Sequence, residues 1–121
     1  MAQTWIAEDR VIFLYPNGVR APGRIAVGAP VLITEGVEAD CMIALDGFEV
    51  YGLPFKGTST LQALLMAVQF IGWRLHNFIS NGGRVLDPND GSDFGLEAYF
   101  GPLLRPAPDT KPPVIDGADT E

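Results

Sequence analysis

The first fifty residues contain several short runs of apolar, mostly β-branched and aromatic side chains separated by Gly, Pro and Asn, a pattern typical of β-strands. In the run 9–15 the odd positions form one apolar face, made by Val11, Phe13 and Tyr15. Asn17-Gly18 follows this run, and Asn-Gly favours a tight hairpin turn because both turn positions require positive φ. We therefore expect a second strand over residues 20–27 and a further apolar segment at 31–33.

A second pair of apolar runs lies on either side of Asp46-Gly47, the other favoured two-residue turn. A loop of this length pairs Leu45 with Phe48 and Ile43 with Val50, which places all four side chains on one face. We therefore expect these two runs to form a hairpin of their own.

From Ser59 onward the apolar spacing changes to that of an α-helix. Ser59 and Gln62 have the spacing of a capping box, no proline follows before Ser80, and 81–83 (Asn-Gly-Gly) is a typical helix stop. This predicts a helix of about 21 residues, or roughly 31 Å. Gly72 lets another backbone approach this helix closely. The stripe expected to pack on the sheet consists of Leu61, Leu64, Leu65, Val68, Ile71, Leu75 and Ile79.

Together these elements predict an α+β fold, an antiparallel meander of about four strands packed by one long α-helix, with a C-terminal extension. The extension begins with a short strand at 84–86 and continues with Phe94, Leu96, Tyr99 and Phe100. We expect residues 1–104 to form a single domain. The tail, 105–121, is rich in Pro and Asp and is expected to be disordered.

The net charge disfavours several classes of partner. It is −7, from fifteen acidic and eight basic residues, and this opposes direct binding to nucleic acid or to an anionic membrane. The single Cys cannot form an internal disulfide, and no run approaches the roughly 20 apolar residues of a membrane span. The first ten residues lack the pattern of a secretory signal. We therefore expect a cytoplasmic protein.

Several short segments resemble a small uncharacterised bacterial α+β domain family. They are Trp5-Ile6-Ala7-Glu8, Ile25 with Gly28-Ala29-Pro30, and a strand ending in Tyr51-Gly52 that leads into the helix Leu61-Gln62-Ala63-Leu64. The similarity covers roughly residues 5 to 80. It implies a compact α+β domain of bacterial type and carries no known activity.

The sequence offers little that indicates an enzyme. His76 is the only possible imidazole base, and its place near the end of the helix is explained by the helix dipole. Cys41 lies on a strand face where a free Cys behaves as a small buried hydrophobe. No phosphate-binding loop or nucleophile motif is present. We expect no catalytic residue and no cofactor.

Residues 87–97 partly resemble a calcium-binding loop, with Glu97 at the position of the terminal ligand. The match is imperfect, because Asn89 and Asp90 are adjacent where the pattern has a spacer, and Asp93 falls where an apolar residue is usual. A polar turn whose side chains bond their own backbone explains the same residues. We therefore predict no metal site, with calcium in this loop as the alternative.

A second apolar line on the helix lies opposite the stripe and consists of Met66, Phe70 and Trp73, spaced i, i+4, i+7. A helix that is apolar on both sides must be covered on both sides. The cover is either the chain's own segment 94–100 or an external one, a second copy or a partner protein. Met and Trp are favoured anchors in such interfaces.

Acidic residues cluster between Arg24 and Lys56, a stretch with no basic residue, and include Glu38, Asp40 and Glu49. Such charge maintains solubility, and in small acidic domains it also steers association with basic proteins. The hypothesis is a small acidic protein-binding module that acts by occlusion, such as an immunity or inhibitor protein of a basic toxin or nucleic-acid-handling enzyme. These acids and the second apolar line would contact the partner. The alternatives are a homo-oligomeric structural domain, or a small-ligand binder or enzyme with a pocket between helix and sheet.

Overall fold

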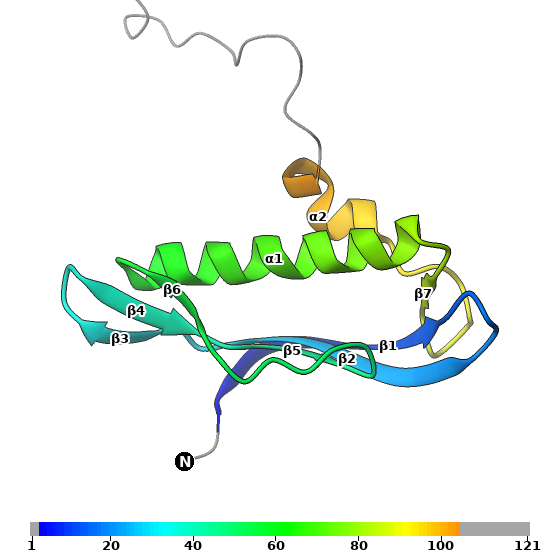
Figure 1. The fold of residues 1–121 in the computed structure, drawn as a ribbon, viewed down its shortest axis with the longest axis horizontal. Helices are drawn as coiled ribbons and strands as arrows, with labels where there is room; N and C mark the ends of the chain where they lie inside the picture. The colour runs from blue at the N-terminus through cyan, green and yellow to red at the C-terminus, as the bar shows by residue number, and fades with distance from the viewer. Residues whose placement is uncertain (1–2, 105–121) are drawn as a thin grey trace, which may run out of the picture.

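The computed structural model describes residues 3–104 and confirms the α+β class, with one long helix lying across one face of antiparallel strands (Figure 1). The elements are β1 (Trp5–Leu14), β2 (Arg20–Gly28), β3 (Val31–Thr34), β4 (Glu38–Cys41), β5 (Ile43–Asp46), β6 (Phe55–Gly57), α1 (Thr60–Ser80), β7 (Arg84–Leu86) and α2 (Leu96–Leu104). The predicted tail, 105–121, lies outside the described residues. No helix within residues 3–104 is long and apolar enough to span a membrane.

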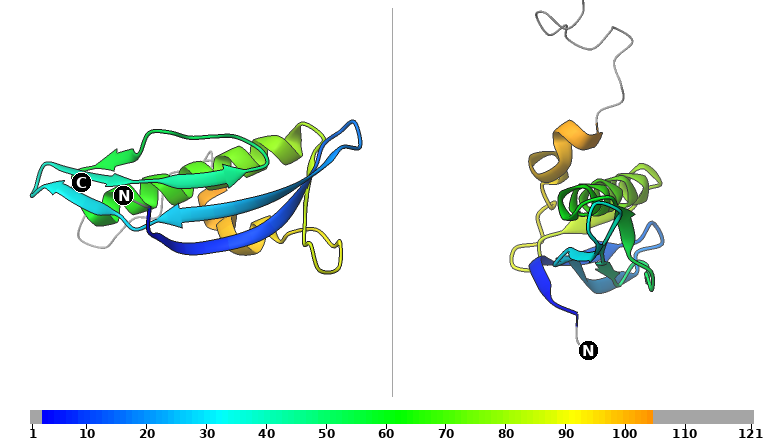
Figure 2. Two further views of the ribbon diagram at one scale, coloured as in Figure 1. Left: turned by 90° about the horizontal axis from the view of Figure 1, so that it is seen from below. Right: turned by 90° about the vertical axis from the view of Figure 1, so that its left-hand side faces the viewer.

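The strands form two sheets, of order β5-β2-β1-β7 and β3-β4-β6. One long hairpin runs through both sheets. Its first side is β2 and then β3, interrupted at Ala29-Pro30, and its second side is β4 and then β5, interrupted at Met42. At the junction the Gly28 N–H donates to the Met42 carbonyl at 2.8 Å. Beyond it, β3 and β4 extend away from the four strands of the first sheet, and the strand that lies beside them is β6 (Figures 1 and 2). We call residues 31–41 the arm.

The predicted hairpin around Asp46-Gly47 is wrong in its pairing. The turn forms, with the Phe48 and Glu49 N–H groups both donating to the Leu45 carbonyl. The following residues then leave the sheet, and Val50 is 94% exposed. β5 pairs instead with β2, which the β1–β2 hairpin already presents as a long partner strand. Segment 48–55 is thereby left to pack against the flank of α1.

The predicted helix bounds are confirmed by the caps. Ser59 Oγ accepts the Gln62 N–H at 3.1 Å, and Gln62 Oε1 accepts the Thr58 N–H at 2.6 Å, so the capping box closes one residue earlier than usual. At the other end, the N–H of the C-cap residue Asn81 donates to the Asn77 carbonyl. The expected 21-residue helix is the one observed.

The predicted sheet-facing stripe of α1 is correct at Ile71 and Leu75, and wrong at Leu61, Leu65 and Ile79, which are exposed. The buried residues are Ala63, Ala67, Ile71, Gly72, Leu75 and Phe78.

The physical reason is a close approach between α1 and β6. A Cβ at Gly57 of β6 would lie 2.6 Å from the Ala63 nitrogen. Only small residues fit where backbones approach this closely, so Ala63 and Ala67 face the sheet and the leucines are turned outward.

At the other end of α1 the core is aromatic. The Phe13 ring centroid lies 5.5 Å from those of Phe48 and Phe78. The C-terminal extension covers the adjacent flank of the helix, where α2 packs against α1 (Figure 2). A Cβ at Gly72 would lie 3.0 Å from the Phe100 ring, so the close neighbour that Gly72 admits is a side chain rather than a backbone.

Candidate functional site

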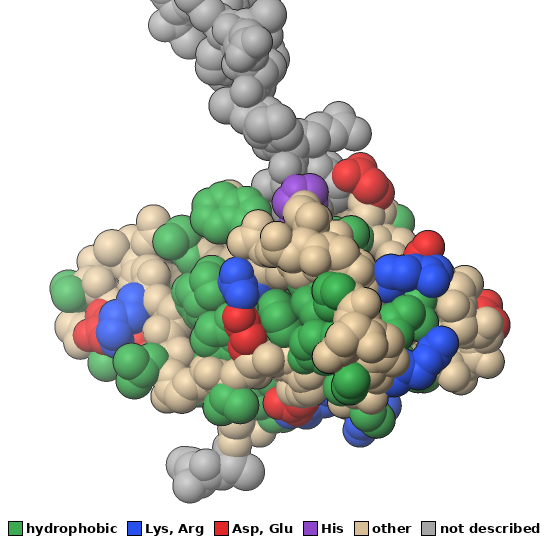
Figure 3. Space-filling model, turned by 45° about the vertical axis from the view of Figure 1, so that its right-hand side comes forward, with side chains coloured by type: hydrophobic (Ala, Val, Ile, Leu, Met, Phe, Trp, Pro, Cys, Tyr) green, Lys and Arg blue, Asp and Glu red, His purple; other side chains and the backbone are tan. Residues whose placement is uncertain are grey.

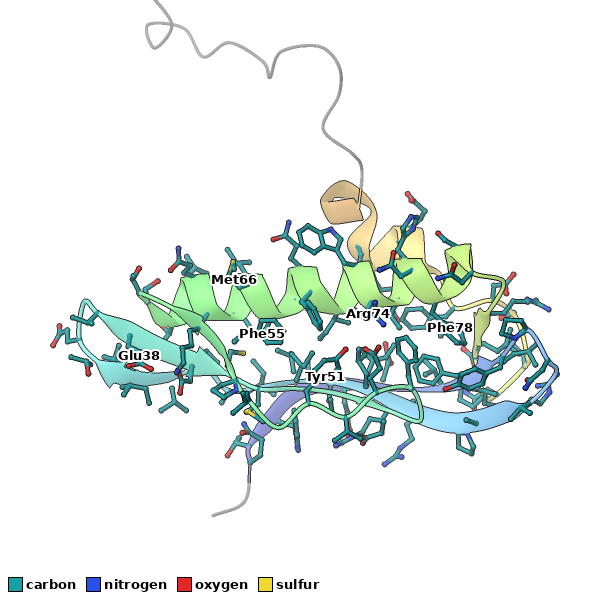
Figure 4. The ribbon with its side chains drawn as sticks, viewed as in Figure 1. Glu38, Tyr51, Phe55, Met66, Arg74 and Phe78 are labelled. Atoms are coloured by element: carbon teal, nitrogen blue, oxygen red, sulfur yellow. The ribbon has the colours of Figure 1, made fainter. Side chains whose placement is uncertain are left out.

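The structure separates the three residues of the second apolar line. Phe70 packs between Tyr51 and Phe55, at ring-centroid distances of 5.4 and 4.7 Å. Met66 and Trp73 are 47% and 50% exposed, and Figure 4 shows Met66 on the outer side of α1 and Phe55 between helix and sheet. Internal cover comes from segment 48–55 and reaches only Phe70. The extension 94–100, which was the internal alternative for this cover, packs on the Gly72 flank instead.

Glu49, predicted to contact a partner, forms an ion pair within the molecule. It accepts the Arg74 Nε–H at 2.9 Å and the Tyr51 hydroxyl. Arg74 projects from α1 toward segment 48–55 (Figure 4), and its hydrogen bond to Glu49 raises the pKa of Arg74. This pair fastens the segment to the helix. No local sequence pattern predicts this ion pair, because the two residues are 25 positions apart.

The other two predicted acids, Glu38 and Asp40, lie on β4 in the arm and share one lysine of β6. Lys56 Nζ lies 2.6 Å from Glu38 Oε2 and 3.1 Å from Asp40 Oδ1, and these hydrogen bonds raise the pKa of Lys56. Glu35 is exposed in the loop of the same arm. The arm therefore carries three acids, and Lys56 of β6, the one base paired with them, leaves a net negative charge. Elsewhere too, basic side chains lie beside acidic ones on the surface (Figure 3).

The outer strand of the arm, β3, has an unpaired edge. Within residues 3–104 it pairs only with β4, because β1 begins at Trp5, opposite the end of β2. All four of its residues are exposed, including three consecutive aliphatic side chains, and Val37 in the adjacent loop is exposed as well. The apolar run 31–33 is visible in the sequence, but its exposure is not. An exposed apolar edge strand is a template for pairing with another chain.

An apolar cavity of about 170 Å³ lies between the first two strands and the two helices. Its lining includes Asp9 from β1 and Tyr99 from α2. A hydrogen bond to Asp9 raises the pKa of the Tyr99 hydroxyl. This cavity lies where the alternative hypothesis expects a pocket between helix and sheet.

The residues considered for catalysis lie in unlike environments. Cys41 is buried, its thiol donates to the Gly28 carbonyl at 3.4 Å, and burial raises its pKa. A buried thiol with a raised pKa is a poor nucleophile. His76 is exposed on α1.

The side chains of the loop 87–93 bond mainly to the loop itself. Asp87 Oδ1 accepts the Asn89 N–H at 2.7 Å, and Asp90 Oδ1 accepts the Ser92 N–H at 2.9 Å, which lowers the pKa of Asp90. Asp93 pairs with Arg84. Among residues 3–104 no group of three or more His, Cys, Asp or Glu side chains is placed to hold a metal ion.

Comparison of the chain with protein-family models, with curated proteins and with solved structures gave no match. The resemblance to a bacterial domain family therefore stays a prediction.

Proposed function

We propose that this protein is a cytoplasmic protein-binding module that acts by occlusion, with the arm as its main contact surface. The observation that carries the proposal is the unpaired edge of β3, which presents three aliphatic side chains to solvent. A partner strand added to this edge gains backbone hydrogen bonds as well as apolar contacts. Monomeric proteins usually protect such an edge with a charge, a proline or a covering segment.

The charge of the arm favours a basic partner. Glu35, Glu38 and Asp40 outnumber Lys56, and the whole chain carries a net charge of −7. This potential accelerates the encounter with a basic surface and repels other acidic proteins. An immunity or inhibitor protein of a basic toxin or nucleic-acid-handling enzyme fits this chemistry. Glu49 has no part in the contact, since Arg74 neutralises it.

A second candidate, self-association, rests on a different surface. Met66 and Trp73 are exposed on the outer side of α1 although large apolar side chains are favoured interface anchors. In a homodimer through this face, Trp73→Glu converts the dimer to a monomer without changing the fold. Sedimentation of the wild type and this variant tests the candidate.

The main proposal is tested by affinity capture from the native cell extract at low and high salt, read by mass spectrometry. The baits are wild type, Leu32→Lys in β3, and Val50→Lys as a matched control outside the arm. We expect wild type and Val50→Lys to retain the same basic protein at low salt and less of it at high salt. Leu32→Lys loses it, because an edge lysine blocks strand addition and repels a basic partner. Equal capture by Leu32→Lys, or no basic protein on any bait, contradicts the proposal.

A further inference from the structure

The cavity beneath α2 contains an acid where the core would otherwise continue. Side chains alternate along β1, so Asp9 points to the same helix-facing side as the buried Val11 and Phe13. Its neighbour across the sheet is Ile25 of β2. Asp9 is therefore a carboxylate on the apolar face of the sheet, at the place where the core opens.

Most of the cavity wall is hydrocarbon, contributed by Ile25, Val27, Val68, Ile71, Phe94 and Phe100. Its volume of about 170 Å³ is close to that of an engineered cavity of about 150 Å³ that binds benzene, and below the roughly 300–1,000 Å³ of pockets for larger ligands. The space fits a compact molecule the size of a substituted benzene ring.

The charge around the cavity is one-sided. None of the residues lining it is Lys, Arg or His. Glu8 is paired with Arg24 at 3.3 Å, whereas Asp9 forms no ion pair within residues 3–104. The neighbouring Asp9 carboxylate raises the pKa of the Tyr99 hydroxyl, and one hydroxyl cannot fill the acceptor capacity of a carboxylate. Asp9 is half-buried at the edge of this apolar wall, so its carboxylate is open to a ligand that carries a cationic or hydrogen-bonding group.

We propose that this cavity binds a small primary amine with a compact hydrocarbon body. Its ammonium group lies against the Asp9 carboxylate, and its hydrocarbon part contacts Ile25, Ile71 and Phe100. The stacked rings of Phe94 and Tyr99, 4.4 Å apart, add a surface that attracts a cation. This binding site is independent of the protein-binding function proposed for the arm.

The test is an NMR titration of the full chain with three probes of the same shape: benzylamine, benzyl alcohol and benzoate. We expect benzylamine to bind about tenfold more tightly than benzyl alcohol, since one charge-assisted hydrogen bond supplies the difference. Benzoate is expected not to bind, because Asp9 repels it. The shifts are expected at backbone amides of β1, β2 and α2 and not in the arm.

Two variants and a control assign the effect to the cavity. Asp9→Asn lowers benzylamine affinity about tenfold and leaves benzyl alcohol unchanged. Ala7→Leu fills the cavity from a solvent-exposed strand position and abolishes binding of both probes. Glu35→Gln removes the same charge in the arm and changes neither affinity.

Three results would overturn the proposal: benzylamine fails to bind at millimolar concentration, it binds no better than benzyl alcohol, or Asp9→Asn retains its preference for the amine. The Ala7→Leu variant keeps the test decisive if Asp9→Asn does not fold.

Discussion

The two sheets form two halves of one strand layer, and these halves are packed in different ways beneath the same helix. In the β5-β2-β1-β7 half, large aromatic rings fill the space, with Phe13 against Phe48 and Phe78. In the β3-β4-β6 half, the buried residues of β4 are the small Ala39 and Cys41, Phe55 of β6 is only half-buried against Phe70, and β3 buries no residue. The first half thus has a deep core, and the second has a thin core with an exposed outer strand.

This difference shows that an apolar run is core or surface according to what covers it. The runs 11–14 and 31–33 look alike as sequence, yet Val11 and Phe13 of the first are buried in the core shared with α1, whereas every residue of the second is exposed. A surface strand that keeps three aliphatic residues adds little stability on its own, so binding is the better explanation of their presence. Stability is expected to depend on the aromatic half, and recognition on the arm.

The largest contrast is expected between core truncations in the two halves. Phe13→Ala removes a fully buried ring and is expected to lower the free energy of unfolding by about 3–5 kcal/mol. Leu32→Ala removes an exposed side chain of β3 and is expected to lower it by less than about 0.5 kcal/mol. Urea unfolding with a common m-value measures both. A loss above about 1 kcal/mol for Leu32→Ala would mean that β3 is covered in solution.

The Arg74–Glu49 pair is expected to make the next largest contribution to the free energy of unfolding. Arg74→Met leaves the half-buried Glu49 carboxylate without its cation and is expected to cost about 1–2 kcal/mol. The double variant Arg74→Met, Glu49→Leu is expected to regain part of that loss, because no unpaired charge remains. Urea unfolding of the single and double variants gives the coupling between the two side chains. A single variant as stable as wild type would show that the pair does not fasten segment 48–55 to the helix.

The burial of Cys41, at the end of the arm, is tested by the pH dependence of stability. Burial raises the pKa of Cys41, so the thiol form is favoured in the folded state. This preference stabilises the folded state fully below the ordinary thiol pKa of about 8.5. The stabilisation is lost as the pH rises through the higher pKa that Cys41 has in the folded protein. Unfolding of wild type is therefore expected to become easier at alkaline pH relative to Cys41→Ala, whose curve lacks this component. The folded thiol is also expected to react slowly with a disulfide reagent at pH 7, and fast reaction would contradict its burial.

Features of the fold that depend on local interactions could be predicted from the sequence, and features that depend on distant segments could not. The helix bounds were predictable because Ser59, Gln62 and the Asn-Gly-Gly stop act locally. The face of α1 was predicted only in part, because the close approach at Gly57 depends on β6 and cannot be seen in the helix sequence. The partner of β5 was missed for the same reason: the turn at Asp46-Gly47 is local, whereas the choice of β2 as neighbour is not.

The candidate site shows the same distinction between local features, which the sequence predicts, and contacts with distant segments, which it does not. The identity of the acidic residues is visible in the sequence, but their free charge is not, since Lys56 and Arg74 come from distant segments. Asp9 was not singled out, although its position in an alternating strand places it on the apolar face. That signal, a charge at an inward position, was available from the sequence alone.

The smallest effect on stability is expected from Lys56, the lysine of β6 that pairs with the arm, and it separates the two halves most directly. Lys56→Met and Arg74→Met change the net charge equally. Lys56 is largely exposed, so its loss is expected to leave urea unfolding unchanged, in contrast to the loss of Arg74. Partner binding is expected to respond in the opposite way. Lys56→Met leaves Glu38 and Asp40 unneutralised in the arm, and capture of a basic partner should strengthen and become more salt-dependent.

Arg74→Met frees only Glu49, outside the arm, and is expected to leave capture unchanged as long as the variant is folded. Equal capture by the two variants would mean that the net charge of the whole chain, and not the arm, attracts the partner. A change in unfolding for Lys56→Met as large as that for Arg74→Met would mean that the arm contributes to stability as the aromatic half does. Either result would remove the physical basis for assigning recognition to β3 and β4.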